Sequence, residues 1–131
     1  MILANPQRER AMRLIKFLCT IAVSILAVGC TSVGDIRTRQ PVYNGQSSKA
    51  PDVLAGCIAD QLEAKKMPNV QARPKTNGYT VMRVDQTMYG PDYAFVIDIE
   101  RRSTTTLAAY SALPFSAGNQ MIVDAIKSCE R

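Results

Sequence analysis

The sequence predicts a small α+β domain, a two-layer sandwich with the element order α-β-β-β-α. Three observations predict it: an amphipathic helical pattern at residues 51–66, a second one after Pro114, and three extended segments between them with short connections. Consecutive strands with short connections favour an antiparallel meander. We therefore expect a three-stranded antiparallel sheet with two helices over one face.

The segment 51–66 has the start, period and end of a helix. Pro51 fits the first helical position, and Asp52 places a negative charge at the positive end of the helix dipole. Its apolar stripe repeats at i+4 and consists of Leu54, Ile58 and Leu62, with Cys57 beside them. Pro68 ends the helix.

Three segments between residues 77 and 110 have the pattern of strands. Asn77-Gly78 is a turn signal before residues 79–85, and residues 89–92 form a second turn before 93–99. Alternation over 93–99 predicts two faces: Tyr93, Phe95, Ile97 and Ile99 on one, and Ala94, Val96, Asp98 and Glu100 on the other. Residues 104–110, rich in threonine, are the third expected strand.

The last helix is expected after Pro114, with Ser116 as its N-cap. Its apolar stripe consists of Met121, Ile122, Ala125, Ile126 and Cys129. Two cysteines, Cys57 and Cys129, therefore belong to the apolar faces of the two expected helices.

The first 29 residues predict a secretory signal. The basic residues come first: Arg8, Arg10, Arg13 and Lys16. An apolar run over 17–28 follows, about twelve residues long, whereas a membrane span needs roughly twenty. A buried core helix is the alternative, but this run is apolar all round instead of amphipathic. Met12 is expected to be the true translation start.

The end of this segment, Leu26-Ala27-Val28-Gly29-Cys30, resembles the lipobox of bacterial lipoproteins. The resemblance covers only the signal. It implies that the Cys30 sulfur receives a diacylglycerol, that the chain is cut before Cys30, and that acyl chains such as palmitate anchor the protein to a membrane. Leucine stands at 26, one position before its commonest place. Cleavage near Ala27, which leaves a soluble periplasmic protein, is therefore the alternative.

The resemblance also implies a destination and a domain organisation. Thr31 follows the cysteine, where lipoproteins retained in the inner membrane typically carry aspartate, so we expect the periplasmic face of the outer membrane. Residues 1–29 form the signal, 30–50 the lipidated cysteine with a flexible tether, and 51–131 the folded domain. Val42 and Tyr43 offer an alternative to the tether, a short edge strand.

Removal of the signal also changes the charge and the cysteine count. Twelve basic and ten acidic residues remain, a balance that argues against a nucleic-acid partner. Cys19 leaves with the signal and Cys30 carries lipid, so Cys57 and Cys129 are the pair expected to form a disulfide between the two helices in the oxidising periplasm. A redox or metal site is the alternative, but there is no C-x-x-C and too few ligands for zinc.

Candidate chemistry is sparse. The chain has no histidine, which excludes Ser-His-Asp and Cys-His nucleophile systems, and we expect neither a metal nor a cofactor. Asp98 and Glu100 alternate onto one strand face, either as a carboxylate pair like that of a glycosidase or as a solvated face. Arg101 and Arg102 either bind a phosphate or peptidoglycan anion or form a polar turn.

These features predict a non-enzymatic lipoprotein of the bacterial cell envelope, a module that binds an envelope protein or peptidoglycan. One alternative is an envelope enzyme, or an inhibitor of a cell-wall hydrolase. The other is an accessory lipoprotein of secretion or assembly.

Overall fold

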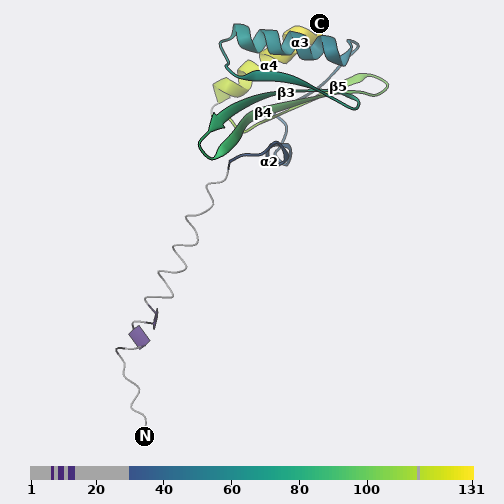
Figure 1. The fold of residues 1–131 in the computed structure, drawn as a ribbon. Coiled ribbons are helices and arrows are strands. Elements are labelled where there is room, and N and C mark those ends of the chain that lie inside the picture. The colour runs from purple at the N-terminus through teal and green to yellow at the C-terminus, as the bar shows by residue number, and fades with distance from the viewer. Residues whose placement is uncertain (1–6, 8, 11, 14–29, 115) are drawn as a thin grey trace.

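The computed structural model describes residues 7, 9, 10, 12, 13, 30–114 and 116–131, and it has a five-stranded antiparallel sheet between helices (Figure 1). The elements in chain order are α2 (Val33–Arg37), β1 (Tyr43–Ser47), α3 (Pro51–Ala64), β2 (Val70–Lys75), β3 (Gly78–Thr87), β4 (Gly90–Arg101), β5 (Thr105–Ser111) and α4 (Ser116–Glu130). The strand order is β1-β5-β4-β3-β2. The α+β class is confirmed, but the prediction of three strands is wrong.

The segment 31–50, which we expected to be a flexible tether, contains α2 and β1. Ser32 begins α2 with a capping box: its hydroxyl accepts from the Asp35 N–H, and the Asp35 carboxylate accepts from the Ser32 N–H. β1 pairs antiparallel with β5, so the alternative of an edge strand near Val42 and Tyr43 is closer to what is found. The segment directly after Cys30 is therefore part of the fold and not a tether.

The other unexpected strand, β2, forms the opposite edge of the sheet. It pairs with β3 from Val70↔Arg83 to Lys75↔Gly78, so Thr76 and Asn77 form the turn that the sequence places near Asn77-Gly78. The side chains of β2 between its two ends are exposed. β2 also contains a proline, Pro74, which has no backbone N–H. An edge strand tolerates it because one side of the strand has no neighbouring strand to accept a hydrogen bond.

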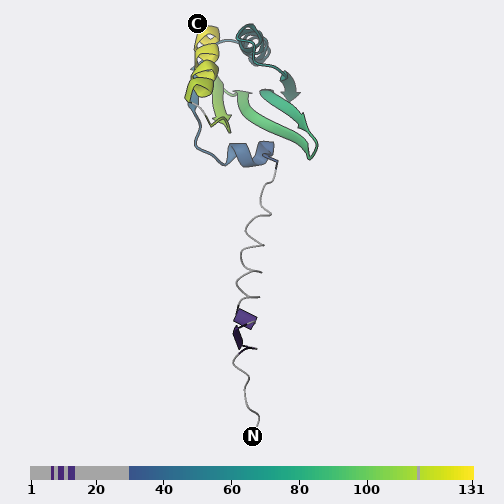
Figure 2. The same ribbon diagram turned by 90° about the vertical axis from the view of Figure 1, so that its left-hand side faces the viewer.

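Helices α3 and α4 lie side by side over one face of the sheet, and α2 lies on the other (Figures 1 and 2). The main core lies beneath α3 and α4 and includes Leu54, Ile58, Leu62, Val81, Phe95, Ile97, Ile99, Leu107, Ile122 and Ile126. Both expected helical stripes are thus buried where the sequence placed them. The two-layer prediction is corrected, because α2 adds a partial third layer.

A smaller apolar cluster forms under α2. Ile36 is fully buried there against Met82, Val84 and Val96, and Tyr93 packs beside them. The expectation that Tyr93 shares a face with Phe95 is wrong. A register shift at the β3–β4 pairing makes Arg83 face Phe95 and Val84 face Tyr93, which turns Tyr93 to the α2 side.

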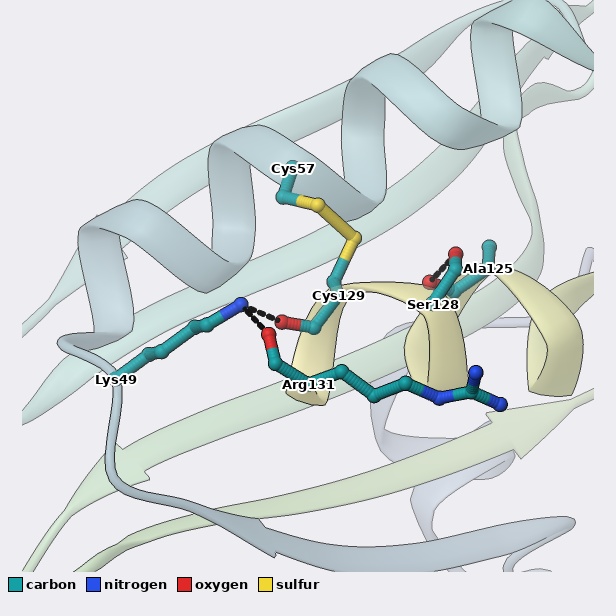
Figure 3. Close-up of a disulfide and its surroundings, with 6 residues drawn as sticks. All are labelled: Lys49, Cys57, Ala125, Ser128, Cys129 and Arg131. Atoms are coloured by element: carbon teal, nitrogen blue, oxygen red, sulfur yellow. Dashed lines mark hydrogen bonds between the residues drawn. A yellow bond between two sulfur atoms is a disulfide. The ribbon is translucent and has the colours of Figure 1, made fainter.

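The disulfide between Cys57 and Cys129 is confirmed and joins α3 to α4 (Figure 3). Beside it, the Lys49 ammonium donates to the carbonyl oxygen of Cys129 at 2.7 Å and to that of Arg131. A cation at these carbonyls matches the negative end of the α4 dipole. The carboxyl end of the chain is therefore held by a covalent bond and by hydrogen bonds.

Candidate functional site: a charged groove on the sheet

An open groove of about 530 Å³ lies over β1, β5 and β4. We call it the outer groove; the side chains that line it include Asn44, Gln46, Asp98, Glu100, Arg102 and Tyr110. Strand register explains why they gather. Ala108 pairs with both Asn44 and Asp98, and Thr106 pairs with both Gln46 and Glu100, so the side chains form two rows across three strands.

Asp98 is the most heavily bonded carboxylate in this region. It accepts two hydrogen bonds from the Arg37 guanidinium, at 2.8 and 2.7 Å, and one from the Thr80 hydroxyl at 3.0 Å. The Lys75 ammonium lies 3.2 Å from the same carboxylate. Burial opposes ionisation of Asp98, but the hydrogen bonds from Arg37 and the charges of Arg37 and Lys75 outweigh it and lower its pKa.

Glu100, two residues along β4, extends the charge network. It accepts from Lys75 at 2.8 Å and from Arg102 at 3.4 Å. The hydrogen bond and the charge of Lys75 are the main reasons that its pKa is lowered. Both carboxylates are therefore ionised at neutral pH and paired with cations. A general acid for glycoside hydrolysis needs the opposite, a raised pKa.

The two arginines of the Arg101-Arg102 turn do not act on one site. Arg102 lines the outer groove and its side chain is 74% exposed. Arg101 lines a separate depression beside Asp52 and Tyr79. The two guanidinium groups therefore do not face one anion, and only Arg102 is available to an anion in the outer groove. The outer groove instead combines this guanidinium with the amides of Asn44 and Gln46 and the phenol of Tyr110.

Two residues of the network were not anticipated, Arg37 and Lys75. Arg37 lies in the segment expected to be a tether, and Lys75 lies on the unpredicted edge strand. The spacing Ser32-x-x-Asp35 is a sequence signal for a helix start and would have placed Arg37 at a helix end. No comparable local signal marks Lys75.

Cys30 lies at the beginning of the folded region, away from the outer groove. Of the three cysteines in the described part of the chain, Cys57 and Cys129 are bonded to each other, and Cys30 is free and exposed. Its Sγ lies 3.5 Å from the carbonyl oxygen of Tyr89, in the β3–β4 turn. The other residues of the expected lipobox, Cys19 and nearly all of the expected signal are outside the described residues.

Two further observations concern the described residues alone. None of their helices is long and apolar enough to cross a bilayer. They also contain no group of three or more histidine, cysteine, aspartate or glutamate side chains placed to hold a metal ion.

Comparison with known proteins gives no match: no family model, curated protein or solved structure matches the chain. Its function is therefore inferred from its own residues.

Proposed function

We propose that this protein is a non-enzymatic lipoprotein of the bacterial cell envelope, anchored through Cys30 and facing the periplasm at the outer membrane. The observation that carries the proposal is the state of the cysteines. The cysteine that ends the lipobox is exposed and free, whereas the other two described cysteines form a disulfide. A structural disulfide suits an oxidising compartment, and an exposed sulfur suits acylation.

The outer groove is the surface that we propose for binding. Its carboxylates are paired with Arg37 and Lys75. The Arg102 guanidinium also lies 3.4 Å from Glu100, but it is largely exposed and is offered to a partner together with two amides and a phenol. Such a set binds polar or anionic groups of an envelope protein or of peptidoglycan. The lowered pKa values of Asp98 and Glu100 favour this binding role over the hydrolytic alternative.

Labelling with radioactive palmitate in a bacterial host tests the anchor. The wild-type protein should be labelled and should sediment with the outer membrane, and Cys30→Ser should lose both properties. Cys19→Ser is the matched control and should keep the label, because Cys19 belongs to the expected signal. Unchanged labelling of Cys30→Ser would end the lipoprotein proposal.

Crosslinking in the native envelope tests the binding surface. A photoreactive residue at Asn44, in the outer groove, should capture a defined protein or a glycan fragment, and one at Asp60, on the exposed side of α3, should not. Arg102→Glu should reduce the capture at Asn44. Equal capture from both positions would show that the outer groove is not the binding surface.

A further inference from the structure

The β3–β4 turn carries the two most exposed large apolar side chains in the described part of the protein. Met88 is 88% exposed and Tyr89 is 84% exposed. The positive φ that favours glycine falls on Gly90 in this turn, so the backbone places no special demand on the side chains at positions 88 and 89, which in exposed turns are usually polar. Two bulky side chains at the end of a long hairpin therefore require a reason other than turn geometry.

The turn itself is well defined by its own hydrogen bonds. The Thr87 hydroxyl donates to the Gly90 carbonyl oxygen at 2.7 Å and accepts from the Tyr89 N–H at 3.2 Å. Gly90 has φ +112°, a conformation that side-chain-bearing residues rarely adopt. Met88 and Tyr89 are thus held at a fixed place at the end of the sheet.

Cys30 lies directly beside this turn. Its Sγ is 3.5 Å from the Tyr89 carbonyl oxygen. The next residue, Thr31, makes two hydrogen bonds with β4: its N–H donates to the Asp92 carboxylate at 3.1 Å, and its carbonyl oxygen accepts from the Tyr93 N–H at 3.2 Å. The sulfur that we propose as the lipid attachment point and the apolar turn therefore lie at the same end of the molecule.

We propose that Met88 and Tyr89 insert into the interfacial region of the membrane that holds Cys30, so that the β3–β4 turn is a second contact with the bilayer. This inference rests on the proposed lipidation of Cys30. Tyrosine suits the interface because its ring is apolar and its hydroxyl reaches water. The charged side chains nearest to the turn in sequence would not attract anionic lipid. Asp92 is itself acidic, and the positive charge of Arg83 is paired with Asp85 at 3.0 Å. The contact should therefore form on zwitterionic lipid.

This orientation determines where the outer groove lies. β4 begins at Gly90, beside the turn, and Glu100 lies near its other end. At roughly 3.3 Å per residue, these two ends are about 30 Å apart. The outer groove is then presented to the periplasm at the end of the sheet that is remote from the lipid.

Tryptophan fluorescence tests the contact, because the chain has no tryptophan. Mature lipidated protein is purified from the bacterial membrane and reconstituted into phosphatidylcholine vesicles with ordinary or brominated acyl chains. Brominated lipid should quench the Tyr89→Trp protein about twofold and leave Val53→Trp unchanged. Val53 is the matched control because it is 55% exposed near the start of α3, where its neighbour Asp52 lines a depression with Arg101, at the end of β4 remote from the turn.

The two proposals fail separately in this experiment. The acyl content of each preparation is measured by mass spectrometry of the amino-terminal peptide before reconstitution. An unacylated Cys30 would overturn both the anchor and the turn contact. An acylated Cys30 with equal quenching of Tyr89→Trp and Val53→Trp would overturn the turn contact alone.

Discussion

Arg37 and Asp98 form a two-point ion pair that joins α2 to β4: Nε donates to Oδ2 at 2.8 Å and Nη2 donates to Oδ1 at 2.7 Å. The two residues are 61 positions apart in the sequence. Two parallel hydrogen bonds fix the planar guanidinium in one orientation. The pair therefore holds the end of α2 against the sheet, next to the outer groove.

Removal of this pair should loosen α2. Arg37→Ala should lower the free energy of unfolding by about 1 kcal/mol, a value that allows for the partial exposure of the arginine side chain. Arg39→Ala, two residues further and exposed, is the matched control and should have little effect. Urea unfolding of the three proteins measures the difference. Equal midpoints for Arg37→Ala and Arg39→Ala would contradict a stabilising role of the ion pair.

Acid should destabilise the protein through the same network. The fold lowers the pKa values of Asp98 and Glu100 from their ordinary values of 3.8 and 4.5. Their stabilising contribution is therefore complete above about pH 4.5 and is lost as the pH falls through the lower folded-state values. Urea midpoints measured from about pH 7 to about pH 3 should fall in this acid range. Asp98→Asn should show a smaller fall, and parallel curves for the two proteins would refute the assignment.

The disulfide should supply a large part of the stability. Cys57 and Cys129 are 72 residues apart, and the loop-closure entropy of the unfolded chain for this separation corresponds to about 4 kcal/mol. The Cys57→Ala/Cys129→Ala protein should lose about this much free energy of unfolding. Wild-type protein in reducing agent is the companion measurement, because it keeps both side chains. If reduction leaves the urea midpoint unchanged, the disulfide contributes no stability.

Two glycine substitutions should have opposite effects. A Cβ on Gly45 would collide with the Glu130 carboxylate and the Tyr43 ring, whose hydroxyl donates to Glu130 at 2.7 Å. That hydrogen bond raises the pKa of Tyr43 to about 12. Gly45→Ala should therefore destabilise by about 1 to 3 kcal/mol. Gly56→Ala, inside α3, adds a methyl group that meets no atom within 4 Å apart from its chain neighbours and the nearby backbone of the same helix, and it should stabilise by about 0.5 to 1 kcal/mol. Thermal unfolding distinguishes the two signs.

The elements that the sequence predicted well are those whose apolar period is unambiguous. α3, β3, β4, β5 and α4 all lie within a few residues of expectation, because one face of each meets the main core. The edge strands were missed for the converse reason. In β2, the residues between Val70 and Lys75 are exposed, so no alternation of apolar side chains distinguishes the strand from a loop.

For a related reason, the sequence predicts the carboxylates of the candidate site but not the cations that pair with them. Asp98 and Glu100 were found because alternation on one strand is a local pattern. Their cations come from distant segments: Arg37 is 61 residues from Asp98, and Lys75 is 25 residues from Glu100. Such pairs depend on strand order and register, which a short-range pattern does not encode.

The bonding of Thr31 determines how a partner would meet this protein. With a lipid on Cys30, the hydrogen bond that Thr31 donates to Asp92 and the one that it accepts from Tyr93 leave no free linker between the anchor and the sheet. A domain on a long flexible chain would sample many heights above the bilayer and would be dilute at each of them. With the proposed anchor and turn contact, the outer groove would be confined to one thin layer above the bilayer. Its effective concentration would then be high for a partner that extends to that layer and close to zero for one that stops short of it.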